Sequence, residues 1–250
     1  MRRGPSSPMR LLYSRAVSCT MAFENSSMTR RNLALNVSRG DDTPRPIASW
    51  YTEGTSDGVG DRLLMFDNSG TPSLELLRFR RELAAVSGFE EALRQRVGRL
   101  DAFVHPAFPQ VRAVDRLEGG GLALVSTFTT GRRLSEVFRT TSRSGVQLTF
   151  AARVIKDVTS AMADLQKQGP GIAHGGLTPD RIVLTPDGRL VITEHVLGAA
   201  LERLQLPVNR LWQDLGVLAP ENGGGAARLD CRTDVIQLGW MVLSMLLGRR

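Results

Sequence analysis

The feature that most limits the fold is a long helical pattern followed by a tight hairpin pattern. Apolar residues recur at 3.6-residue spacing over Phe150–Leu165, and Gly169-Pro170 ends the stripe. Two strand-like runs, Arg181–Thr185 and Arg189–Thr193, then flank Pro186-Asp187-Gly188. Proline presets φ and glycine accepts a positive φ, so this tripeptide favours a hairpin turn. The sequence therefore predicts a long helix and then a β-hairpin in its second half.

The first half has a different pattern. From Phe89 the apolar residues fall at helical spacing, and we expect His105-Pro106 to end that helix, because a residue before proline is pushed out of the α region. The remaining apolar runs alternate with turn residues and predict strands. These runs are Leu63–Phe66, Leu74–Phe79, Gln110–Leu117 and Leu122–Phe128. A small β-rich half with one helix thus precedes a helical half, which closes with an apolar helix over Asp234–Leu247.

Composition narrows the class of protein. The chain has 250 residues, 42% of them hydrophobic, which suffices for one core or two small lobes. The two cysteines, Cys19 and Cys231, form neither a disulfide framework nor a metal-binding spacing, which favours a reducing, cytoplasmic location. No apolar run approaches the roughly 20 residues of a membrane span. The nearest, Val235–Leu247, is interrupted by polar residues and is better explained as a buried helix.

The basic charge is concentrated at the amino terminus. Residues 1–48 carry eight arginines against three acidic residues, which accounts for +5 of the net charge of +7. These arginines are scattered and lack interleaved aromatic residues, so we expect no specific nucleic-acid binding. We interpret residues 1–48 as a disordered leader and linker, with contact to an anionic partner as the alternative. Residues 49–250 are then the folded domain.

Several segments together resemble the protein kinases. The segment His174–Ile182 resembles the catalytic loop, and Thr193–Val196 lies where kinases carry Asp-Phe-Gly. Three further segments resemble the linker after helix C, the end of the activation segment and the central helix of the large lobe. They are Val104–Val111, Ala219-Pro-Glu221 and Asp234–Gly239.

The resemblance implies an α+β, bilobal protein-kinase-like fold over residues 49–250. Residues 49–125 would form the small β-rich lobe, and residues 126–250 a helical lobe that is truncated after its central helix. Architectural positions of the family are retained, among them His174 and Asp234; in kinases the aspartate matching Asp234 holds the backbone of the catalytic loop.

The residues that perform kinase chemistry are replaced. Kinases use a lysine on the ATP phosphates and an aspartate as catalytic base. The lysine position should lie near Leu77 or Arg78, but no lysine precedes Lys156. The position of the base is Gly176, which cannot accept a proton.

The metal-binding positions are replaced as well. The asparagine that binds Mg²⁺ in kinases is matched by Arg181, a cation where a cation would bind, and the metal-binding aspartate is matched by Glu194. A single hard ligand makes a poor Mg²⁺ site, so we expect no metal site. His195 replaces the phenylalanine of Asp-Phe-Gly, and we interpret it as a core histidine.

Binding of adenine nucleotide is a separate question. The glycine-rich segment Glu53–Asp61 offers Gly58 and Gly60, whose backbone N–H groups could contact phosphates. A flexible linker turn explains these glycines as well, and we favour it. Val183 matches a position on the apolar adenine floor. If ATP binds, we expect weak binding through Gly58, Gly60, Val183 and Glu194, with Mg²⁺ doubtful.

These replacements imply a pseudokinase. Such a domain would act as a non-catalytic binding, scaffolding or regulatory unit in signalling, with another protein (a kinase, a substrate or a regulator) as its partner. Two alternatives stay open. One is an active or atypical Ser/Thr kinase that uses Glu194 and an unorthodox cation, and the other is a truncated kinase-like fragment without function.

Overall fold

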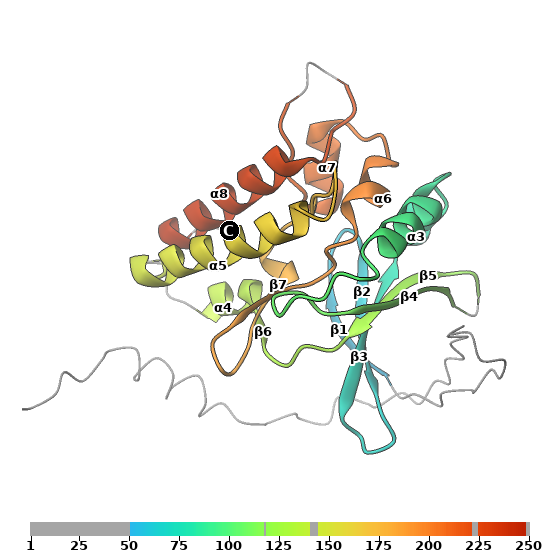
Figure 1. The fold of residues 1–250 in the computed structure, drawn as a ribbon, viewed down its shortest axis with the longest axis horizontal. Helices are drawn as coiled ribbons and strands as arrows, with labels where there is room; N and C mark the ends of the chain where they lie inside the picture. Colours follow the sequence, from blue (N-terminus) through green and yellow to red (C-terminus); the bar gives the residue numbers. More distant parts are fainter. Residues whose placement is uncertain (1–50, 118, 141–144, 222–224, 249–250) are drawn as a thin grey trace, which may run out of the picture. The chain divides into compact units, whose positions relative to one another are not determined.

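The computed structural model describes residues 51–117, 119–140, 145–221 and 225–248. The first of these residues form a five-stranded antiparallel sheet with the order β1-β2-β3-β5-β4 (Figure 1). Helices α2 (Arg81–Ala84) and α3 (Phe89–Arg99) lie between β3 and β4 in the chain. The strands are β1 (Tyr51–Ser56), β2 (Gly60–Phe66), β3 (Pro72–Phe79), β4 (Val111–Arg116) and β5 (Leu122–Thr127). The four strands expected from the apolar runs are thereby confirmed.

The predicted end of the first helix is wrong. Helix α3 ends at Arg99, because Leu100 has left helical geometry with φ −106° and ψ 10°. The N–H of Leu100 donates to the carbonyls of both Arg96 and Val97, as is common in a fraying last turn. Val104 is 82% exposed, so its helical spacing in the sequence did not reflect burial. His105-Pro106 therefore lies in the connection that follows the helix.

The glycine-rich segment is a β-hairpin between β1 and β2, and the expectation of a flexible linker turn is wrong. The Asp57 carboxylate accepts from the N–H groups of Val59 (2.8 Å) and Gly60 (3.1 Å), which fixes the turn. Val59 is fully buried in the main core. A Cβ atom on Gly58 would lie 2.1 Å from the carbonyl oxygen of Asp214, so glycine is required by this close approach.

The second half of the described chain is mainly helical. A three-stranded sheet, β6-β7-β8, lies beside the helices, and α5 and α8 run side by side (Figure 1). The long helix and the hairpin predicted from the sequence are confirmed as α5 and β7–β8. The elements are β6 (Arg132–Arg133), α4 (Leu134–Thr140), α5 (Leu148–Gln166), the 3₁₀ turn η1 (Pro179–Arg181), β7 (Ile182–Leu184), β8 (Leu190–Ile192), α6 (Gly198–Glu202), α7 (Val208–Leu215) and α8 (Cys231–Leu247).

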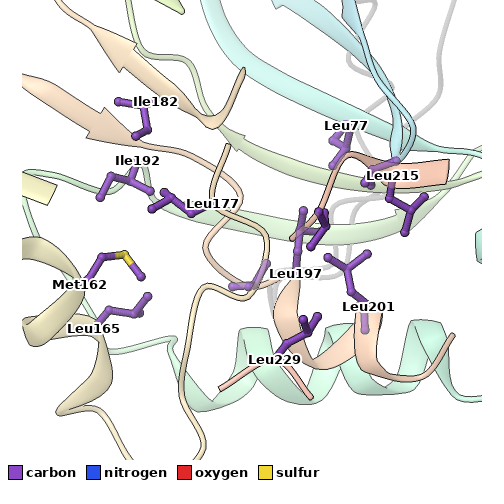
Figure 2. Close-up of a cluster of buried hydrophobic side chains, with 14 of the residues drawn as sticks. Leu77, Met162, Leu165, Leu177, Ile182, Ile192, Leu197, Leu201, Leu215 and Leu229 are labelled. Atoms are coloured by element: carbon purple, nitrogen blue, oxygen red, sulfur yellow. The ribbon is translucent and has the colours of Figure 1, made fainter. Parts of the chain in front are cut away.

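One hydrophobic core joins the sheet to the helices. Figure 2 shows Met162 and Leu165 of α5 near Ile192 of β8, and the same cluster includes Leu77 of β3 and Leu215 of α7. A smaller cluster that includes Leu63, Leu76 and Val125 forms separately on β2, β3 and β5. Within the residues described above, no helix is both long and apolar enough to cross a membrane.

Helix α8 holds the loop that precedes η1. The buried Asp234 carboxylate accepts from the N–H groups of His174 (3.1 Å) and Gly175 (2.8 Å), and from the side chain of Gln166 (3.1 Å). Burial raises the pKa of Asp234, and the hydrogen bonds from these two N–H groups and from Gln166 act against that rise. Asp234 thus makes the contact to the loop backbone that the resemblance implies.

Replacing Asp234 by alanine should lower the free energy of unfolding by about 2–4 kcal/mol, because two buried N–H groups lose their acceptor. Urea denaturation at neutral pH would measure the loss. Asp157→Ala is the matched control, because Asp157 makes only a half-exposed ion pair with Arg153 on α5; its effect should stay within about 0.5 kcal/mol. Equal losses for the two variants would contradict the anchoring role of Asp234.

Candidate functional site

Glu194 lies at the centre of the candidate site, two residues after β8. Its side chain is 3% exposed, and its backbone has φ 61°, in the left-handed region that a residue with a side chain rarely adopts. Arg62 of β2 binds the carboxylate with two donors, Nε at 2.5 Å from Oε1 and Nη2 at 2.9 Å from Oε2. A backbone strain of about 1–3 kcal/mol is thus offset by a buried, bidentate ion pair.

Arg181 binds the same carboxylate. Its Nε donates to Oε2 of Glu194 at 2.6 Å, and its Nη1 donates to the carbonyl of Gly176 at 2.8 Å. The side chain is fully buried. The resemblance matches Arg181 to the Mg²⁺-binding asparagine of the kinases, and its guanidinium group binds Glu194 there.

Asp57 completes a cluster of four charges. Its Oδ2 accepts from Nη2 of Arg62 and from Nη2 of Arg181, each at 2.9 Å. We call Asp57, Arg62, Arg181 and Glu194 the ion cluster. Its two cations balance its two anions. The ion cluster links β2 and the β1–β2 turn, in the first half of the chain, to η1 and the segment after β8, in the second half.

The arginines keep the central carboxylate ionised. Burial raises the pKa of Glu194, but the charges of Arg62 and Arg181 outweigh burial and hold this pKa well below its usual range. Burial likewise acts to lower the pKa of Arg62, and Glu194 and Asp57 more than reverse that effect. Glu194 is therefore a carboxylate at neutral pH, with both oxygens already bound to guanidinium groups.

A second buried ion pair lies beside the ion cluster. Both carboxylate oxygens of Glu75 on β3 accept from Nη2 of Arg133 at 2.7 Å, while Nη1 of Arg133 donates to the carbonyl of Asp180. Sequence reasoning sought the strand lysine near Leu77 or Arg78 and missed Glu75. Side chains alternate along a strand, so Glu75 and Leu77 share a face, and both line the cavity described next. Arg78 instead pairs with Asp61 at 2.8 Å, half exposed.

The cavity between the sheet and Glu194 is small. Its volume of about 10 Å³ suffices for about one water molecule. It is lined by Glu75, Leu77, Pro109, Leu124, Ser126, Thr127, Thr129, Thr193 and Glu194. Among the four residues predicted to contact ATP, Glu194 is the one that lines this cavity. Gly58 approaches Asp214, Gly60 approaches the backbone of Arg78, and Val183 lies against Gly131.

The loop at the catalytic position is ordered by a neutral histidine. Nε2 of His174 lies 3.0 Å from the carbonyl of Thr193, and Nδ1 lies 3.3 Å from the N–H of Gly176. These partners assign the proton to Nε2, and burial lowers the pKa of His174 to about 4. Gly176 offers only its backbone, and its carbonyl is bound by Arg181. Gly176, which the resemblance matches to the catalytic base, thus offers no proton acceptor on a side chain.

His195 is buried in an aromatic cluster. Its ring centroid lies 5.0 Å from that of Phe108 and 6.2 Å from that of Phe103. Its Nδ1 is buried and has no hydrogen-bond partner among the described residues. Burial lowers the pKa of His195 to about 3. His195 is a core residue, as the sequence predicted, although one of its polar atoms lacks a partner.

Sequence reasoning also missed Arg96 on α3. Its neighbour Arg94 instead pairs with Glu90 on the surface. The buried Arg96 donates to the carbonyls of Ala173 and Gly171, each at 3.0 Å. It therefore ties α3 directly to the loop that leads to Gly176.

The donor set does not fit a Mg²⁺ ion. Across residues 51–117, 119–140, 145–221 and 225–248, no group of three or more His, Cys, Asp or Glu side chains could hold a metal. Glu194 is neutralised by two arginines, and a divalent cation there would meet both guanidinium groups.

Solved structures of other proteins are similar to this chain over most of its length. The crystal structure of the Mycobacterium tuberculosis PknI kinase domain is similar with a TM-score of 0.57 and 16% identity, over 80% of this chain and 73% of that one. The structure titled "PpkA-294 apo form" has a TM-score of 0.60 and 15% identity, over 89% and 80% of the two chains. No family model and no curated protein matches the sequence. The chain therefore has a protein-kinase-like fold, with an antiparallel small lobe and a helical lobe.

Replacing Glu194 by glutamine should lower the free energy of unfolding by about 3–5 kcal/mol, because Arg62 and Arg181 would stay buried without their shared anion. Urea denaturation at pH 7 would measure this. Glu136→Gln serves as control, since Glu136 makes a half-exposed pair with Arg132 and should cost at most about 1 kcal/mol. If Glu194 were solvated and available to a metal, the glutamine variant would be nearly as stable as the natural protein. A loss of stability as small as that of the control would therefore contradict the buried ion pairs of Glu194.

His195 should make stability depend on pH. Its folded pKa of about 3 lies below the usual value of 6.5, so the unfolded chain binds more protons between these values and stability falls as the pH drops below 6.5. At pH 5 the loss is about 2 kcal/mol for one such histidine. His195→Phe should remove this part of the loss between pH 7 and pH 5, measured by urea denaturation at each pH. An unchanged pH profile in the variant would show that His195 does not titrate in this way.

Proposed function

We propose that this domain is a pseudokinase, which binds partners without transferring phosphate. The observation that carries the proposal is Arg181, whose buried guanidinium binds Glu194 at 2.6 Å in the position that should hold a metal ion. Kinase catalysis depends on Mg²⁺ to neutralise the charge on the transferred phosphate and on a base that orients the attacking hydroxyl. Arg181 opposes the first requirement, and Gly176 lacks the second.

The lysine of the kinases has no counterpart at the cavity. The β3 residues that line it are Glu75 and Leu77, and Glu75 carries the opposite charge. Arg62 supplies a cation from β2, but its Nε and Nη2 groups already donate to Glu194. A planar guanidinium also does not replace a compact ammonium group at a phosphate. These contacts support loss of phosphoryl transfer more strongly than an active or atypical Ser/Thr kinase.

The scaffold is retained although the chemistry is lost. Gln237 of α8 accepts from the N–H of Leu177 at 2.6 Å and donates to the carbonyls of Gly175 and Leu218. Together with Asp234, it anchors the backbone of the loop around Gly176. An ordered loop without a base fits a binding or scaffolding role, and we propose another protein as the partner. Adenine nucleotide would be a weak ligand at most, because the cavity holds about one water.

The proposal predicts no phosphate transfer. Radiolabelled ATP with Mg²⁺, incubated with the full chain and with generic protein substrates, should give the same signal as a reaction without protein. Arg181→Gln should give that background signal too, because Gly176 still provides no base. An active kinase of the same fold is the positive control. Mg²⁺-dependent autophosphorylation that Glu194→Ala abolishes would overturn the proposal in favour of an active enzyme.

A further inference from the structure

Asp57 has the position of a bound anion. Its Oδ2 lies 2.9 Å from Nη2 of Arg62 and 2.9 Å from Nη2 of Arg181, two guanidinium groups from distant parts of the chain. We infer that Arg62 and Arg181 form a polyphosphate-binding site that the chain's own Asp57 carboxylate occupies and closes. This inference rests on the proposed function, because it assumes that Arg181 has replaced the metal. The ligand would therefore bind without a divalent cation.

The two arginines are suited to phosphate oxygens. Guanidinium groups stay charged and bind phosphate and carboxylate through the same fork of N–H donors. Glu194 uses Nε and Nη2 of Arg62 and Nε of Arg181, and so holds both groups in place. Nη1 of Arg62 is buried and has no hydrogen-bond partner among the described residues. This unused donor is an independent indication that the site can bind more than Asp57.

Charge balance makes Asp57 a competitor. With Asp57 present, the ion cluster has two cations and two anions. Without the Asp57 charge, the cluster keeps an excess of one positive charge in a site where Arg62 and Arg181 are at most 2% exposed. A buried, uncompensated cation attracts an anion strongly, because the low local dielectric weakens screening. A polyphosphate would therefore gain affinity when Asp57 is neutralised.

Asp57 also couples the site to the glycine-rich turn. The side chain of Asp57 is 15% exposed, whereas those of Arg62 and Arg181 are at most 2% exposed. Its Oδ1 holds the N–H groups of Val59 and Gly60, and Arg80 binds its carbonyl at 2.8 Å. A ligand that displaces the carboxylate must therefore move this turn and expose the buried Val59. The turn acts as a gate that keeps binding by the natural protein weak.

The test is Asp57→Asn in the full chain. Asparagine keeps an oxygen for the N–H groups of Val59 and Gly60 but removes the charge that faces the arginines. Isothermal titration calorimetry with inorganic tripolyphosphate, ATP and adenosine, all in EDTA, measures binding. We expect tripolyphosphate and ATP to bind the variant about tenfold tighter or more than the natural protein. Asp61→Asn is the matched control, because Asp61 pairs with the half-exposed Arg78 outside the ion cluster, and it should bind like the natural protein.

The outcomes separate the possible ligands. If the affinities for tripolyphosphate and ATP rise equally in the variant, the site binds phosphate alone. A larger rise in affinity for ATP supports added contact with its adenosine part. Adding Arg181→Gln to Asp57→Asn should abolish the gain, since one of the two guanidinium groups is lost. An absent gain in a variant that melts cooperatively, or a gain for adenosine alone, would overturn the inference.

A second variant guards against misfolding. Asp57→Ser removes the carboxylate and keeps a hydroxyl that can accept from the N–H of Val59, so it should show the same gain. If neither variant melts cooperatively, the test is made on the natural protein. We then expect tripolyphosphate in EDTA to raise its melting temperature, and an unchanged melting temperature would overturn the inference. Phosphate transfer in the radiolabel assay would instead refute the proposed function, whatever the result in EDTA. The two failures are therefore distinguishable.

Discussion

The rest of the structure depends on the ion pairs that Glu194 makes with Arg62 and Arg181. Burying a charge costs several kcal/mol, and an ion pair offsets this only when its geometry is good and its remaining donors are satisfied. Here the carboxylate is bound on both oxygens, at 2.5–2.9 Å, by side chains from β2 and η1. Burial of Arg62, Arg181 and Glu194 is therefore compatible with a stable fold only when all three charges are present.

The closed form of the site follows from this constraint. Nη2 of Arg181, and Nη2 of Arg62 that also donates to Glu194, bind Asp57 in the β1–β2 turn. In this position of the turn, Gly58 lies against the backbone of Asp214 and Val59 packs in the hydrophobic core. The space that remains between the sheet and Glu194 holds about one water molecule. The side chains of the ion cluster therefore fill the site, because their charges balance and the β1–β2 turn is short.

The elements were predictable from the sequence because periodicity and turn residues act locally. The stripe over Phe150–Leu165 and the turn at Pro186-Asp187-Gly188 gave α5 and the β7–β8 hairpin in this way. The pairing of Glu194 with Arg62 was not predictable, since Arg62 lies 132 residues away in the sequence and no local pattern marks it. Glu75 could have been found by alternation along β3, and the end of α3 was missed because Val104 has helical spacing without burial. Domain boundaries near residue 48 lie outside the described residues.

The proposed replacement of a metal ion by Arg181 would explain why anion binding survives while phosphate transfer is lost. A Mg²⁺ ion between phosphates can adjust its ligands as charge moves during transfer, whereas Arg181 is fixed by Glu194, Gly176 and Asp57 at once. A fixed cation can hold an anion, yet it cannot follow the transferred group or accept a proton from the attacking hydroxyl. Under the proposed function, Arg181 keeps a positive charge at this place in the fold, and a fixed positive charge favours binding of an anion over catalysis.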